Sequence, residues 1–118
     1  MDATRRQQLI DGGIDVDDAL SRFMGSEAML FRFLNKFPAD VNYSKLVQAV
    51  AAGAREDALT ASHTLKGVSG NLSFTALYDL TDRQVKAMRA NEWDDAFAMM
   101  DQITAAYEKV LHAITAGQ

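Results

Sequence analysis

A single proline, Pro38, and seven glycines leave few points in the 118 residues at which a helix must end. Clusters of β-branched residues with the two-residue alternation of strands are absent from the sequence. Apolar residues instead recur at helical spacing along the whole chain. No internal repeat, low-complexity tract or linker interrupts the pattern. The sequence therefore predicts an all-α fold.

Turn signals divide the chain into short helices followed by longer ones. A first short helix ends at Gly12, and Asp15 and Ser26 are each placed to cap a helix after it. Pro38 suits the first turn of the next helix. We expect four longer helices joined by short turns, over residues 39–52, 55–73, 75–90 and 92–116.

The last of these helices carries the clearest pattern. Its apolar positions alternate four and three residues apart, at Trp93, Phe97, Met100, Thr104, Tyr107, Leu111 and Ile114. Such a stripe buries one face against neighbouring helices at shallow crossing angles. We therefore expect one domain over 1–118: an antiparallel up-down four-helix bundle over 38–118, with short helices in 1–37 capping one end.

Composition excludes several classes of function. Twelve Lys and Arg against sixteen Asp and Glu give a net charge of −4, which argues against nucleic acid as a partner. The absence of cysteine excludes disulfides, a thiolate nucleophile and cysteine-based metal sites. The sequence has no apolar run long enough for a membrane span or a signal peptide. We expect a cytoplasmic protein with no membrane partner and no metal site.

The helix expected over 55–73 has an unusual outer face. At about 100° per residue, His63 lies about 160° from Leu65, opposite the buried stripe. Gly67 and Gly70 share the outer face with His63. Two glycines inside a helix cost about 2 kcal/mol relative to alanine. Glycines that let helices pack closely would lie on the buried stripe, so we interpret this surface as room for a partner to approach the imidazole.

The residue types on this face suit phosphoryl chemistry. Lys66 lies one turn beyond His63 and about 60° around the helix axis, so its ammonium could reach an anion attached to the ring. Neutral imidazole is a nucleophile near pH 7 and needs no general base to attack phosphorus. The sequence has no glycine-rich phosphate loop and no second histidine nearby. The phosphoryl donor must therefore bring its own nucleotide or metal.

The segment SHTLKGVSGNL, residues 62–72, closely resembles the signature of histidine-containing phosphotransfer (HPt) domains, the phosphoryl carriers of two-component phosphorelays. The family pattern is His-x-Leu-Lys-Gly followed by small residues, an apolar residue and usually glycine. Ser73 departs from it, since glycine is common there, and we expect this to affect the next turn and not the acceptor. The resemblance covers most of the chain, including the upstream segments Gly13-Ile14-Asp15-Val16, Ala19-Leu20-x-Arg22-Phe23 and Phe37-Pro38-Ala39-Asp40.

The resemblance implies a role for each matching residue. His63 would be the phosphoacceptor, through the ring nitrogen farther from the backbone, and Lys66 would stabilise the phosphoryl charge. Gly67 and Gly70 would leave room for the partner.

The resemblance also implies partners. Receiver domains of response regulators supply the aspartyl phosphate, the magnesium ion and most catalytic groups, and a hybrid histidine kinase is a further expected partner. The chain itself would be a monomer with no cofactor of its own, no ATP binding and no autokinase activity. Some relatives place a glutamine on the following helix near the histidine. Gln84 is our candidate for that role, although the alignment puts Val85 there.

Apolar residues beside the acceptor predict a docking surface. Leu59 lies about 120° from Leu65 and Phe74 about 180°, so both are expected to be partly exposed. We expect Leu59, Phe74 and Thr60 to contact the receiver.

Two other functions stay open at this point. A helical interaction module could use the same face to sequester a receiver or bind a kinase without carrying phosphate, although the intact His63-x-x-Lys66-Gly67 argues against it. A bundle enzyme or metal carrier using His63 and His112 ranks last, because no acidic ligand stands at ligand spacing. The plainer interpretation of His112 is a surface residue near a helix C-terminus. The initial methionine suggests a free-standing module, and an excised domain of a hybrid kinase is the alternative.

Overall fold

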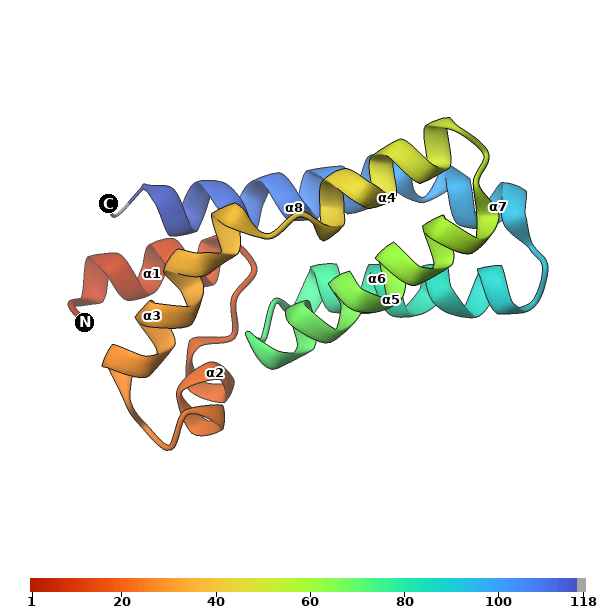
Figure 1. Ribbon diagram of the computed structural model, residues 1–118. Helices are drawn as coiled ribbons and strands as arrows, with labels where there is room; N and C mark the ends of the chain where they lie inside the picture. The colour runs from red at the N-terminus through yellow and green to blue at the C-terminus, as the bar shows by residue number, and fades with distance from the viewer. Residues whose placement is uncertain (117–118) are drawn as a thin grey trace.

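The computed structural model describes residues 1–116, and within this range the chain is all-helical (Figure 1). Three short helices and a 3-10 turn come first: α1 (Ala3–Asp11), α2 (Val16–Arg22), α3 (Glu27–Lys36) and η1 (Phe37–Ala39). They are followed by α4 (Asn42–Ala51), α5 (Arg55–Asn71), α6 (Thr75–Arg89), α7 (Trp93–Ala98) and α8 (Met100–Thr115). The all-α prediction is confirmed. None of these helices is long and apolar enough to span a membrane.

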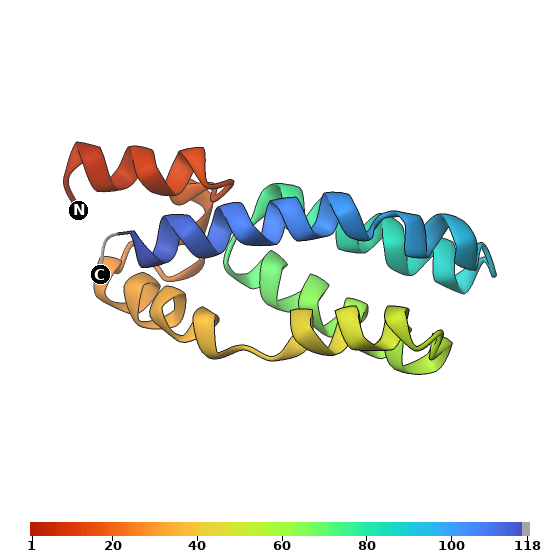
Figure 2. The ribbon, with the colours of Figure 1, turned by 90° about the horizontal axis from the view of Figure 1, so that it is seen from above.

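The longer helices lie along the long axis of a molecule that measures 44 × 24 × 20 Å (Figures 1 and 2). α5 packs against α4 on one side and α6 on the other, and α6 packs in turn against α7 and α8. α1 lies alongside the C-terminal part of α8, and α2 and α3 complete the same end of the molecule. The helix that carries His63 is thus held between two neighbours, with part of its surface left open.

The caps expected from the sequence set the starts of the short helices. The side-chain oxygens of Asp15 and Ser26 each accept a hydrogen bond from the backbone N–H three residues on, as predicted. Pro38 differs from expectation, because it lies in η1 and not in the first turn of α4. The Asp40 carboxylate accepts from the backbone N–H of Asn42 at 2.9 Å, and α4 begins there.

The helix expected over 92–116 is two helices, since α7 ends at Ala98 and α8 begins at Met100. Its buried face also lies slightly to one side of the predicted stripe. The fully buried positions are Ala96, Ile103, Val110, Ala113 and Ile114. The other members of the predicted stripe are half-buried beside them: Trp93, Phe97, Met100, Thr104, Tyr107 and Leu111. The heptad spacing therefore located the face of the helix, and the smaller residues between occupy its centre.

An aromatic cluster joins the N-terminal helices to the longer ones. The Phe37 ring meets Phe74 edge-on, with ring centroids 4.9 Å apart, and lies 5.7 Å from Tyr107. Tyr107 stacks on Tyr43 at 3.9 Å, and the Tyr43 hydroxyl lies 2.7 Å from the Thr104 hydroxyl. Offset and edge-on aromatic pairs are favourable beyond their buried area. The turn after α3, the start of α6 and the middle of α8 therefore share one core.

Candidate functional site

α5 presents its buried and outer faces as the sequence predicts. Ala58, Ala61, Leu65 and Ser69 are buried, whereas the imidazole of His63 is exposed on the opposite side. Among residues 1–116, no group hydrogen-bonds or ion-pairs with this imidazole. Its ring nitrogens are therefore open to a reagent from solvent.

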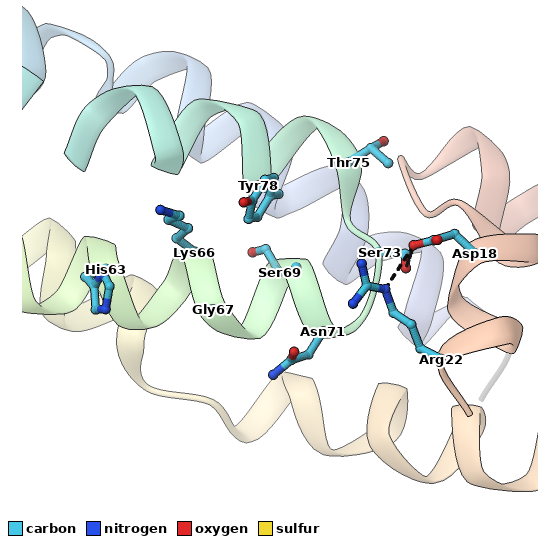
Figure 3. Close-up of a pocket in the computed structure, with 11 residues that line it drawn as sticks. Asp18, Arg22, His63, Lys66, Gly67, Ser69, Asn71, Ser73, Thr75 and Tyr78 are labelled. Carbon is cyan, nitrogen blue, oxygen red and sulfur yellow. Dashed lines mark hydrogen bonds and ion pairs between the residues drawn. The ribbon is translucent and has the colours of Figure 1, made fainter. Parts of the chain in front are cut away.

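His63 lines an open cavity of about 470 Å³ between α5, α6 and α2 (Figure 3). α5 contributes four of the residues predicted for the site, Gly70 among them, and other walls come from residues far away in the sequence. The lining includes His63, Lys66 and Gly67 from α5, Tyr78 from α6, and Asp18 and Arg22 from α2. The lining of the cavity includes no aliphatic side chain, and the imidazole that borders it is exposed.

Lys66 lies on this face, but its ammonium already has a partner. Its Nζ lies 3.0 Å from the Oδ1 of Asp82 on α6, and the Nζ of Lys86 lies 2.9 Å from the Oδ2 of the same carboxylate. The hydrogen bond from Lys86 and, to a smaller extent, that from Lys66 lower the pKa of the Asp82 carboxyl below its usual 3.8. Asp82 was not predicted as a site residue from the sequence. The spacing of four residues between Asp82 and Lys86 on one helix predicts the ion pair between these two residues, but no local pattern predicts the ion pair between Asp82 and Lys66.

The two glycines of α5 differ in their surroundings. A Cβ added to Gly67 would meet nothing within 4 Å, as expected for a surface left bare for a partner. A Cβ added to Gly70 would lie 3.1 Å from two carbons of the Tyr78 ring. The Tyr78 ring thus takes up part of the space beside Gly70, and the prediction that Gly70 leaves room for a partner stays a prediction. α6 turns back across the end of α5 and brings Tyr78 there (Figure 3).

The prediction that Gln84 stabilises a phosphoryl group is wrong. Gln84 is fully buried, and its amide oxygen accepts a hydrogen bond from Ser62 at 2.7 Å. The amide nitrogen donates to the backbone oxygen of Ala96 at 2.9 Å. Both ends of the amide are thus used in the core, where they tie α5 and α6 to α7. Val85, the alternative position, is also fully buried.

Of the three residues predicted for docking, Phe74 is not on the surface. α5 ends at Asn71, and Ser73 has a φ of 58°, so a projection at 100° per residue fails before it reaches Phe74. The Phe74 ring is fully buried against Phe37. Leu59 is half-buried against the core and Thr60 is exposed. The docking role of Leu59 and Thr60 stays a prediction.

The turn after α5 is anchored to α2 through residues that the sequence analysis did not connect. The Ser73 hydroxyl donates to the Asp18 Oδ2 at 2.6 Å, and the Arg22 Nε lies 3.0 Å from the same oxygen (Figure 3). These two hydrogen bonds lower the pKa of the Asp18 carboxyl, and the one from Ser73 has the larger effect. Serine replaces the usual glycine here, keeps the left-handed backbone and adds this contact. The expected effect of this departure on the turn stays a prediction.

His112 is exposed on α8 in the last turn, as the plainer interpretation predicts. It lines a separate cavity of about 270 Å³ together with Gln8 and Asp11. In residues 1–116, no group of three or more His, Asp or Glu side chains is placed to hold a metal ion. The absence of a resident cofactor stays a prediction.

Comparison with known proteins gives one match. A family model described as "Hpt domain" matches residues 29–113, which run from α3 to α8 and include His63, Lys66 and Gly67. No curated protein and no solved structure matches the chain.

Proposed function

The chain belongs to the Hpt domain family, whose members serve phosphotransfer in two-component signalling, and from this premise we propose that His63 is its phosphoryl carrier. His63 would accept the group from an aspartate of one receiver domain and pass it reversibly to an aspartate of another. The observation that carries the proposal is the exposed imidazole beside Gly67, where an added Cβ meets nothing within 4 Å. At Gly67 itself, no side chain of this protein stands in the way of a partner.

The transfer step needs only one nucleophile from this chain. The Nε2 of His63, unprotonated in the reactive tautomer, forms a bond to phosphorus while the bond from phosphorus to the aspartyl oxygen breaks. The aspartate leaves as a carboxylate, and the ring keeps the proton on Nδ1. The step is reversible because a second aspartyl carboxylate can attack the phosphohistidine in the same way. The ammonium of Lys66 would offset charge on the phosphoryl group.

The partners supply the rest of the chemistry in this proposal. Receiver domains bring the aspartyl phosphate and magnesium, and a hybrid histidine kinase would be the first donor of the relay. The chain would act as a cytoplasmic monomer that neither binds ATP nor phosphorylates itself. α4, α5, α6 and α8 would form the antiparallel four-helix bundle that presents His63, with α1, α2 and α3 capping one end.

A panel of phosphorylated receiver domains with magnesium tests the proposal. Wild type and His112→Ala should take up a label that is labile in acid and stable in alkali, whereas His63→Ala should take up none. Because His63 is exposed, its replacement should change the free energy of unfolding by less than about 0.5 kcal/mol. Circular dichroism and urea unfolding of each variant check this control.

The same experiment separates the alternative function. Binding of a receiver to wild type and to His63→Ala alike, with no label on either, would identify a module that sequesters its partner. Label on wild type that persists in His63→Ala would move the acceptor to another residue.

A further inference from the structure

One carboxylate on α6 holds two lysines beside the phosphoacceptor. Asp82 pairs with Lys66 through one oxygen at 3.0 Å and with Lys86 through the other at 2.9 Å. The side chains of Lys66 and Asp82 are only 23% and 20% exposed, whereas that of Lys86 is 74% exposed. The ion pair between Lys66 and Asp82, which joins α5 to α6, is thus less exposed than the pair between Lys86 and Asp82. Dissolved salt screens such a partly buried pair less than a pair on the surface.

Once His63 is phosphorylated, Lys66 can pair with either of two anions, the Asp82 carboxylate or the phosphoryl group. Residues three apart on a helix have Cβ atoms about 5–6 Å apart, within reach of a lysine stem. Figure 3 shows the Lys66 side chain extending from α5 toward α6, the helix that carries its partner Asp82. A phosphoryl group on the ring and the Asp82 carboxylate would therefore compete for this ammonium.

Charge favours a move of Lys66 to the phosphoryl group after phosphorylation. A phosphoryl group carries about −1.5 to −2 near neutral pH, against −1 for a carboxylate. Lys86 lowers the cost further, because it remains paired with Asp82 when Lys66 leaves. Without Lys86, the departure of Lys66 would strand a half-buried carboxylate.

We propose that Asp82 is a positioning residue that holds Lys66 away from His63 until the imidazole is phosphorylated, and that Lys86 keeps Asp82 paired after Lys66 moves. This inference rests on the proposed phosphotransfer function. Asp82 competes with the phosphohistidine for Lys66 and so lowers the share of phosphoryl group that resides on this chain. The competition makes His63 a readier donor to the next receiver.

The proposal predicts opposite effects for two substitutions in one cluster. Asp82→Asn frees Lys66, so the ratio of phosphorylated to unphosphorylated chain at equilibrium with a receiver should rise about two- to fivefold, the range expected for a partly exposed ion pair, and the phosphorylated fraction should rise with it. Lys86→Gln leaves Asp82 with Lys66 alone, so the ratio should fall by a similar factor. In a Lys66→Gln background, Asp82→Asn should have no effect on the fraction.

Asp79→Asn is the matched control. Asp79 lies one turn before Asp82 on the same helix and pairs with Arg83 at 3.2 Å, with both side chains more than half exposed. Asp79→Asn changes the net charge by the same amount as Asp82→Asn, and the phosphorylated fraction should stay as in wild type. A merely structural role for Asp82 would lower the melting temperature without the opposite shift in Lys86→Gln.

The experiment first loads wild type with phosphoramidate, a small-molecule phosphoryl donor, and then equilibrates it with a receiver that exchanges label with it. Failure of wild type to take label from phosphoramidate and from every receiver would overturn the phosphotransfer function and this inference with it. Normal loading of wild type with an unchanged or lowered fraction in Asp82→Asn would overturn the inference alone. A raised fraction in Asp82→Asn, a lowered one in Lys86→Gln and no change in Asp79→Asn would support it.

Discussion

Replacement of Gly67 by alanine adds one methyl group to α5 at a point where it meets no other atom within 4 Å. Alanine in a helix interior is about 0.5–1 kcal/mol more favourable than glycine, and nothing in the surroundings of Gly67 opposes this gain. We therefore expect the free energy of unfolding to rise by about 0.5–1 kcal/mol and the melting temperature by about 2–5 °C. The same methyl group should obstruct the partner. Overpacking of a close-fitting contact costs about 1–3 kcal/mol, so transfer to His63 should be about fivefold slower or more.

Gly70→Ala is the matched comparison within the same helix. Its methyl group would lie 3.1 Å from the Tyr78 ring, so the ring must shift by a few tenths of an ångström. We expect this repulsion to offset the helix-propensity gain and leave the free energy of unfolding within about 0.5 kcal/mol of wild type. Because the added methyl group would lie against Tyr78 and not in open space, the rate of transfer should change less than in Gly67→Ala.

Urea unfolding and the rate of label uptake from a phosphorylated receiver measure the two effects separately. The account requires Gly67→Ala to be the more stable and the slower variant. A Gly67→Ala protein that is stabilised but accepts phosphoryl groups at the wild-type rate would refute the idea that a partner approaches this surface. Equal slowing in Gly70→Ala would show that the Tyr78 contact does not distinguish the two positions.

Three further predictions concern the turn, the core and the ion pair. The free energy of unfolding in urea should be about 1 kcal/mol lower for Ser73→Ala than for Ser73→Gly, because alanine must adopt the left-handed φ of 58°. Gln84→Met should lower the free energy of unfolding by about 1–3 kcal/mol in the same assay, since it leaves the buried Ser62 hydroxyl without an acceptor, while transfer by the folded fraction is unchanged. Because the pKa of Asp82 is lowered in the folded protein, its carboxylate adds stability at pH values above the usual 3.8, and this stability is lost as the pH falls below that value. In Asp82→Asn, the free energy of unfolding, measured in urea as a function of pH, should therefore fall less steeply in this acid range.

Local features of the fold were predictable from the sequence. Asp15 and Ser26 cap helices because a cap depends on a side chain and a backbone N–H only three residues away. The exposure of His63 opposite Leu65 follows from helix periodicity within one unbroken helix. These predictions needed no knowledge of what packs against α5.

Features set by the neighbouring helix were not predictable in this way. Periodicity gives Gly67 and Gly70 the same outer face, yet only α6 decides that Tyr78 covers the second of them. The projection to Phe74 failed because the left-handed turn at Ser73 ends the helix without a glycine to signal it. An angular projection is valid only as far as the helix continues.

Polar side chains were the hardest to assign. Gln84 could stand beside the acceptor or inside the core, and its use by Ser62 and the Ala96 backbone became visible only from the packing of three helices. The pair between Lys66 and Asp82 joins residues sixteen positions apart on α5 and α6. The break between α7 and α8 at Met99 has no proline or glycine beside it, and nothing in the structure explains it.

The central claim is that phosphorus becomes bonded to the Nε2 of His63. The most direct test is a ³¹P–¹⁵N correlated NMR spectrum of the uniformly ¹⁵N-labelled chain after phosphorylation by a receiver. The account predicts one phosphorus signal coupled to the Nε2 of His63 and its disappearance in His63→Ala. A signal coupled to His112, or phosphorus bound to oxygen alone, would contradict it.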